Sequence, residues 1–196
     1  AQKNYLLALR NRGVKIHFVV YDLLPILMPK VFSIGAEQWH QQWLSVVTQF
    51  DTVMCISHAV EKELIDWCKT QTIKRHRDFQ TAWFHLGADI HNVLPSLGLP
   101  QNAHKILNTL TKQPTFLMVG TIEPRKGHKQ VLDAFEQLWK DGIAVNLAIV
   151  GKQGWMMEGT NKKLKQHSEL NKQLFWFEGI SDEYLEKVYA NSICLI

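Results

Sequence analysis

Short runs of β-branched and aromatic residues alternate with longer stretches of helical periodicity, and this alternation restricts the fold more than any other feature of the chain. It is typical of βα units that build a mostly parallel sheet. The predicted strands are 14–21, 52–56, 81–86, 115–119, 145–150, 174–178 and a strand that opens at 193. The predicted helices are 36–50, 58–69, 103–110, 127–140, 158–167 and 182–189.

The periodic pattern weakens between residues 92 and 114, where four residues interrupt it: Pro95, Gly98, Pro100 and Pro114. Such a stretch is typical of a connection between domains. The sequence therefore predicts an α/β chain with two units, 1–97 and 115–196, joined by a connection over 98–114. The chain starts without an initiator methionine and stops inside a predicted strand, so we expect both units to be incomplete and the chain to be truncated at both ends.

The charge distribution narrows the classes of partner. The net charge of +4 is scattered, which suits an anionic small ligand or a membrane surface and argues against a nucleic-acid partner. Three widely spaced cysteines fit neither a disulfide framework nor a metal site. No run approaches the roughly 18 apolar residues of a spanning helix. The nine histidines lack ligand spacing and no Asp-x-Asp occurs, so we expect no metal and no cofactor.

The segment 116–127, FLMVGTIEPRKG, is the most informative for chemistry. An apolar strand ends at Gly120, a short loop presents Arg125 and Lys126, and a helix begins after Gly127. This arrangement places two cations beside the positive end of a helix at the carboxyl edge of a parallel sheet, which predicts a phosphate site. The alternative is that both cations are solvated loop charges.

Several segments together resemble the GT-B glycosyltransferases of family GT4, the glycosyl transferases group 1. The runs VGTIEPRKGHKQVLDAFEQLW, LAIVGKQGW and FWFEGISDEYLEKVYANSICLI resemble the nucleotide-binding domain of that family. The runs VVYDLLPILMP, TVMCISHAV and WFHLGADI resemble the later half of its acceptor domain. The resemblance implies two Rossmann-like domains, with residues 1–97 in the acceptor domain and 115–196 in the nucleotide-sugar domain.

The resemblance also implies which residues form the donor site. Lys126 would hold the diphosphate, and Arg125 would supply the second cation, because Thr121 stands where relatives often carry an arginine. Gly179 and Ile180 would receive the nucleobase, unless they form an ordinary strand-to-helix turn. The implied donor-binding residues are Gly120, Thr121, Arg125, Lys126, Gly151, Lys152, Gly179 and Ile180. A plain turn is the open alternative for Gly151 and Lys152.

On the acceptor side, Tyr21-Asp22 stands where many relatives carry a His-Asp or His-Glu pair. Tyrosine does not relay protons near neutral pH, so the implied catalytic role rests on Asp22, with a turn cap before Pro25 as the alternative. Three assignments are expected to be structural: Ser57 as a helix cap, the Trp39 and Trp43 pair as core, and the His85 and His91 pair as surface.

The implied reaction is transfer of a sugar from a nucleoside-diphosphate sugar to an acceptor hydroxyl, with retention at the anomeric carbon. Lys126, Arg125 and Asp22 are the implied catalytic residues, and departure of the nucleotide would need no metal. The expected donor is GDP-mannose, from which mannose is transferred. The expected acceptor is a glycan or a lipid-linked sugar, and the expected pathway is polysaccharide biosynthesis. We expect a cytoplasmic protein with possible peripheral membrane contact.

Two other functions are open to an α/β chain of this kind. A nicotinamide-dependent enzyme lacks support because no G-x-G-x-x-G follows a predicted strand. A non-catalytic module that binds nucleotide sugars or docks partners is the open alternative. The resemblance places paired glutamates of the family's catalytic domain beyond Ile196, so we expect this chain alone to have little or no turnover.

Overall fold

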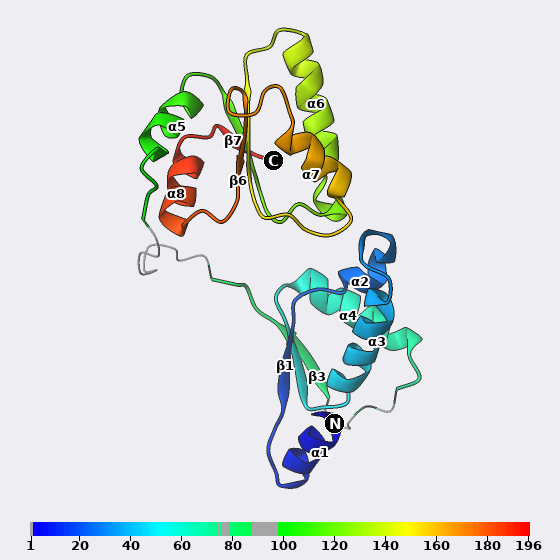
Figure 1. The fold of residues 1–196 in the computed structure, drawn as a ribbon. Helices are drawn as coiled ribbons and strands as arrows, with labels where there is room; N and C mark the ends of the chain where they lie inside the picture. Colours follow the sequence, from blue (N-terminus) through cyan, green and yellow to red (C-terminus); the bar gives the residue numbers. More distant parts are fainter. Residues whose placement is uncertain (1, 74, 76–78, 88–97) are drawn as a thin grey trace. The chain divides into compact units, whose positions relative to one another are not determined.

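The computed structural model describes residues 2–73, 75, 79–87 and 98–196. The chain divides into two compact units, Ala1–Asp89 and Ile90–Ile196 (Figure 1). Within the described ranges, no helix has the length and apolar character needed to cross a bilayer.

The first unit is built on a parallel three-stranded sheet in the order β1-β2-β3. Its strands are β1 (His17–Val20), β2 (Thr52–Cys55) and β3 (Gln80–Trp83). Its helices are α1 (Gln2–Asn11), α2 (Leu24–Leu27), the 3-10 turn η1 (Pro29–Val31), α3 (Ala36–Val47) and α4 (His58–Thr70). Buried side chains of α3 and α4 pack against Val20, Val53 and Cys55 of the sheet, which gives this unit its own core.

Two of the structural expectations for this unit can be checked directly. The hydroxyl of Ser57 accepts a hydrogen bond from the backbone N–H of Val60 at 3.2 Å, which confirms that Ser57 caps α4. The expectation of a buried tryptophan pair is confirmed for Trp43, which packs on the core, and is wrong for Trp39, which is 68% exposed. Both lie on α3, but the core covers only one stripe of that helix.

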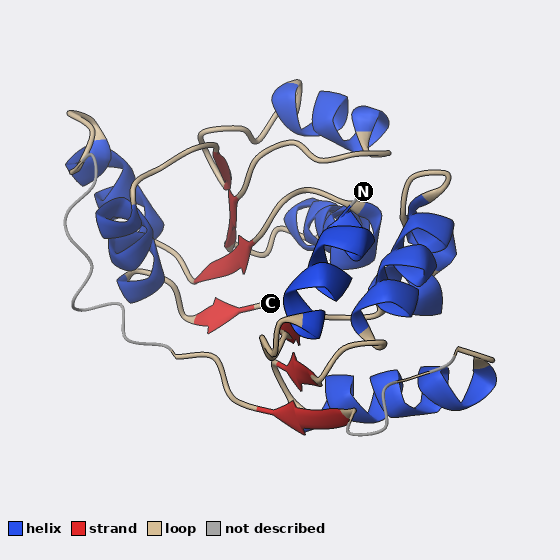
Figure 2. Cartoon of the chain, turned by 90° about the horizontal axis from the view of Figure 1, so that it is seen from below, coloured by secondary structure: helices blue, strands red, loops and turns tan. Residues whose placement is uncertain are grey.

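The second unit holds a parallel four-stranded sheet in the order β6-β5-β4-β7. Its strands are β4 (Thr115–Val119), β5 (Asn146–Val150), β6 (Leu174–Phe177) and β7 (Cys194–Leu195). Its helices are α5 (Ala103–Leu110), the 3-10 turn η2 (Pro124–Lys126), α6 (His128–Lys140), α7 (Glu158–Lys165) and α8 (Asp182–Ala190). Figure 2 shows the strands of both units in red beside the helices that cover them.

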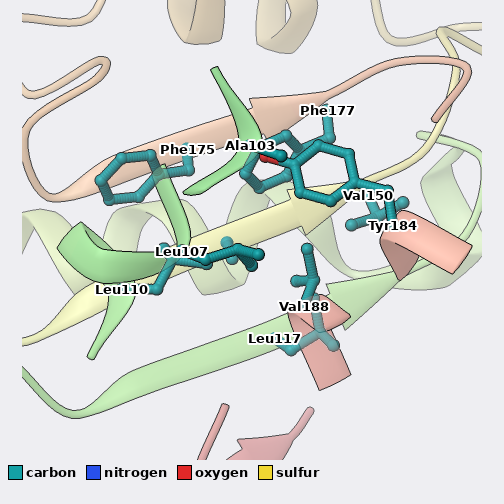
Figure 3. Packing of buried hydrophobic residues seen from close by; sticks show 10 residues of the cluster. Ala103, Leu107, Leu110, Leu117, Val150, Phe175, Phe177, Tyr184 and Val188 are labelled. Atoms are coloured by element: carbon teal, nitrogen blue, oxygen red, sulfur yellow. The ribbon is translucent and has the colours of Figure 1, made fainter. Parts of the chain in front are cut away.

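Helices cover both faces of the second sheet. α5 and α8 lie on one face, while α6 and α7 lie on the other (Figure 1). Every residue of β5 is consequently buried, as expected for a central parallel strand. On the α5 and α8 face, Phe177 packs edge-on against Tyr184 beside Val150 and Val188 (Figure 3).

The stretch 98–114, predicted as a connection between domains, differs from that expectation. It contains α5, whose Ala103, Leu107 and Leu110 are buried in the core of the second unit (Figure 3). The clustered prolines suggested a linker, whereas the apolar stripe of α5 supplies enough burial to join the core. The helix therefore belongs to the second unit.

Ser181 fixes the start of α8, and its loss should destabilise the second unit. Its hydroxyl accepts from the N–H of Tyr184 at 3.1 Å and donates to the carbonyl of Gly98 at 2.6 Å. We expect Ser181→Ala to lower the free energy of unfolding by about 2 kcal/mol, because a cap and a partly buried hydrogen bond are lost together. Urea denaturation measures this loss, with exposed Ser168→Ala as the control. Equal stability of the two variants would contradict the capping role.

Candidate functional site

Three loops meet where β4, β5 and β6 end, at the carboxyl edge of the second sheet. Gly120 follows β4, Gly151 follows β5, and Gly179 lies two residues beyond β6. The strand hydrogen bonds continue into these loops, because Gly120 N–H donates to Val150 O at 2.8 Å and Gly151 N–H donates to Phe177 O at 2.9 Å. The edge where parallel α/β sheets bind ligands is therefore built from glycines.

The β4 and β5 loops touch through their backbones. A β-carbon at Gly151 would lie 1.9 Å from the carbonyl oxygen of Gly120, so only glycine fits there. A β-carbon at Gly154 would lie 2.6 Å from the carbonyl oxygen of Ile122. Two hydrogen bonds hold the pair together, from Ile122 N–H to Lys152 O at 2.9 Å and from Gly154 N–H to Ile122 O at 3.0 Å. The two loops therefore form one fixed surface.

The side chain of Lys126 packs over Gly120. A β-carbon at Gly120 would lie 3.6 Å from Lys126 Cε and 3.8 Å from Nζ. Gly120 has φ +144°, a conformation that L side chains rarely adopt. Lys126 is exposed and has no ion-pair partner within residues 2–73, 75, 79–87 and 98–196. An uncompensated positive charge thus lies at the edge of the sheet, directly before α6.

Arg125 is engaged differently from its neighbour. Its Nη2 lies 2.6 Å from Oε1 of Glu123, a carboxylate that is only 2% exposed. A buried carboxylate needs such a partner, because an unpaired charge is costly away from water. The sequence predicted both cations for an anionic ligand, and the structure shows that the charge of Arg125 is already matched by Glu123. Lys126 is the cation that remains available in this loop.

The other implied donor residues gather at the same edge. A β-carbon at Gly179, whose φ is +66°, would lie 3.9 Å from Cε of Lys152, so the β5 and β6 loops are also close. Thr121 is exposed beside Gly120, while Ile180 packs partly against the core. The structure therefore brings the implied donor residues of all three loops together, although their binding roles stay predictions.

His128, the first residue of α6, lies beneath this loop. It is 1% exposed, and neither ring nitrogen has a hydrogen-bond partner among the described residues. Burial lowers the pKa of His128, and the positive charge of Lys126 lowers it further. The backbone of Gly120 and of Glu123 acts to raise the pKa of His128, although neither forms a hydrogen bond with the ring. Burial and the charge of Lys126 therefore both disfavour the protonated form of the ring.

On the first unit, Asp22 is placed as a turn residue. Its Oδ1 accepts from the N–H of Leu24 at 3.0 Å, which is the capping alternative that the sequence left open. Its carbonyl oxygen lies 3.1 Å from Nε2 of His40, and the preceding Tyr21 is 59% exposed. A role of Asp22 toward a sugar hydroxyl stays a prediction.

One member of the histidine pair expected at the surface lies within the described residues. His85 is exposed and packs edge-on against Trp83, with ring centroids 5.0 Å apart. His91, its predicted companion, lies outside the described residues.

Sequence reasoning missed three residues that support the loops. Glu123 and His128 flank the two cations, and their burial beside a predicted polar loop gave no distinct signal. Trp176 donates from Nε1 to the carbonyl of Gly151 at 2.9 Å, which braces the β5 loop from β6. Only the parallel pairing of β5 with β6 places this indole there.

Parallel α/β units with a cationic loop after one strand are the features of the Rossmann-like GT-B glycosyltransferase class. Residues 101–196 match the family model described as Glycosyl transferases group 1. The chain is also 42% identical, over 191 residues and 96% of its length, to the serotype-specific mannosyltransferase WbdA of Escherichia coli. Two further WbdA sequences from the same organism match at 42% identity over 192 residues. The chain covers 23–24% of the length of these relatives.

Proposed function

We propose that the second unit binds the diphosphate of a nucleoside-diphosphate sugar and serves in transfer of a mannosyl group to a glycan hydroxyl. The observation that carries this proposal is the unpaired side chain of Lys126 across Gly120, at the carboxyl edge of the sheet and before α6. The mannosyl donor is proposed because the similar Escherichia coli proteins are mannosyltransferases. GDP-mannose is the proposed donor.

Transfer is proposed to proceed with retention at the anomeric carbon. The bond from that carbon to the diphosphate oxygen breaks, and a bond to the acceptor oxygen forms on the same face. The proton of the acceptor hydroxyl passes to the departing diphosphate oxygen. Negative charge grows on the diphosphate as it departs, so a fixed cation stabilises the transition state more than the ground state. Lys126 supplies that charge in the proposed mechanism, and no metal ion is invoked.

Arg125 and Lys152 have supporting roles in the proposal. Arg125 shapes the loop through Glu123, because the ion pair spans the turn that presents Lys126. Lys152 lies against Gly179, where its charge would face the nucleotide side of the edge. Asp22 of the first unit is proposed to orient a hydroxyl of the acceptor, which is a glycan or a lipid-linked sugar.

Calorimetric titration of the chain with GDP, UDP and NAD tests the proposed donor site. We expect GDP to bind and NAD not to bind, because the loop is built for a diphosphate beside a helix rather than for a dinucleotide fingerprint. Tighter binding of UDP than of GDP would overturn the choice of nucleobase alone. Absence of binding for both nucleoside diphosphates would overturn the function.

A further inference from the structure

A buried imidazole follows, two residues along the chain, the cation that the β4 loop leaves unpaired. His128 follows Gly127 at the start of α6, and the charge of Lys126 acts on its ring. The described residues offer the ring nitrogens no hydrogen-bond partner, although the side chain is almost completely buried. Buried polar groups are normally paired, so this one calls for an explanation in the chemistry of the loop.

The surroundings of His128 suit a second protonation state. The pKa of the ring is lowered chiefly by burial, and the backbone of Gly120 and of Glu123 opposes this lowering without forming a hydrogen bond to either ring nitrogen. A protonated ring has two N–H donors, one for each of these two residues, whereas a neutral ring has one. The imidazolium would therefore fasten both ends of the loop segment 120–123 to α6.

The net charge of the β4 loop affects whether the His128 ring is neutral or protonated. The ammonium group of Lys126 opposes a second positive charge, and the carboxylate of Glu123 is occupied by Arg125 at 2.6 Å. A phosphate-bearing ligand on Lys126 would cancel that opposition and add negative charge to the same loop. Protonation of the ring would then become more favourable than in the free chain.

We propose that His128 is a positioning residue that takes up a proton from solvent when a diphosphate binds at Lys126. The loop then holds the ligand with two positive charges, and the imidazolium fixes the backbone of Gly120 and Glu123 that supports Lys126. This inference rests on the proposed diphosphate site, but it concerns a residue that contacts the ligand only through the loop.

Proton uptake is measured by titrating GDP into the chain at about pH 6.5, the ordinary pKa of histidine, in buffers of different ionisation enthalpy. The pKa of His128 lies below this pH in the free chain and rises on binding, so binding should take up protons and tighten as the pH falls. We expect a substantial fraction of one proton per GDP in the unaltered chain. We expect that uptake to be lost in His128→Gln.

The matched control is His104→Gln, because His104 is an exposed histidine on α5 of the same unit. Protonation of GDP itself contributes equally to the proton uptake of both variants, so it cancels when one uptake is subtracted from the other. Equal uptake in both variants overturns the inference while the proposed function stands. Absence of GDP binding by the unaltered chain overturns both, and binding without pH dependence overturns only the inference.

A second measurement applies if His128→Gln does not fold. The pKa of the His128 ring is followed by NMR in the unaltered chain, with and without saturating GDP. We expect a pKa below the ordinary histidine value in the free chain and a higher value in the complex. An unchanged pKa in the presence of bound GDP would overturn the inference.

Discussion

Replacement of Lys126 by alanine is expected to weaken binding of GDP by about tenfold to a hundredfold. A charged hydrogen bond contributes about 1.5–3 kcal/mol, and each 1.4 kcal/mol is a factor of ten in affinity. Lys126 is exposed and unpaired among the described residues, so its removal leaves no buried group without a partner. The change should therefore appear in the dissociation constant and leave the free energy of unfolding almost unaltered. Calorimetric titration of folded variants measures it.

Lys129→Ala is the matched control for this experiment. Lys129 is an exposed lysine of α6, three residues further along the chain, whose Nζ lies 2.7 Å from Asp133. The two variants carry the same net charge, so any general electrostatic effect on a polyanion is shared. If both variants bind GDP as the unaltered chain does, Lys126 does not hold the diphosphate. In a full-length enzyme, we expect kcat/KM to fall by one to two orders of magnitude in Lys126→Ala.

Gly151→Ala is expected to cause the largest loss of stability. The new methyl carbon would lie 1.9 Å from the carbonyl oxygen of Gly120, and hydrogen bonds hold the backbone of both residues in place. One of the two loops must shift, which should lower the free energy of unfolding of the second unit by about 3 kcal/mol or more. Urea denaturation measures the stability, and the indole N–H signal of Trp176 reports on Gly151 locally.

Gly159→Ala serves as the control for that substitution. Gly159 lies within α7, and a β-carbon there would meet nothing within 4 Å. Alanine in a helix is favoured over glycine by about 0.5–1 kcal/mol, so this variant should be slightly more stable than the unaltered chain. Similar stabilities for the two variants would show that the loops at Gly120 and Gly151 yield easily.

The alternation of periodicities predicted the order of strands and helices well, because each repeating unit carries its own local pattern. Helix α6 and strand β5 illustrate this, since an apolar stripe and a continuous apolar run are visible in single segments. Helices α1 and α2 were both missed. The four residues of α2 are too few to show a period, and the pattern of α1, which precedes the first predicted strand, was not recognised as helical. Helix α5 was recognised, but its membership of the second core depends on contacts with distant residues.

The sequence predicted which residues gather at the carboxyl edge of the second sheet, but it did not predict their interactions. The motif EPRKG located Lys126, and the strand order placed Gly120, Gly151 and Gly179 at one edge. The pairing of Arg125 with Glu123 could not be predicted, because two adjacent cations look equivalent until one carboxylate is known to be buried. The same holds for His128, whose polar side chain follows a loop that the sequence presents as exposed.

The hydrogen bonds that join the β4 and β5 loops have a kinetic consequence. The amides of Gly120, Ile122, Gly151 and Gly154 are already committed to partners within the protein. A ligand at this edge therefore meets a rigid template and loses little free energy to ordering backbone. The association rate should then depend on diffusion and electrostatic attraction. Competing nucleotides should therefore differ mainly in their dissociation rates.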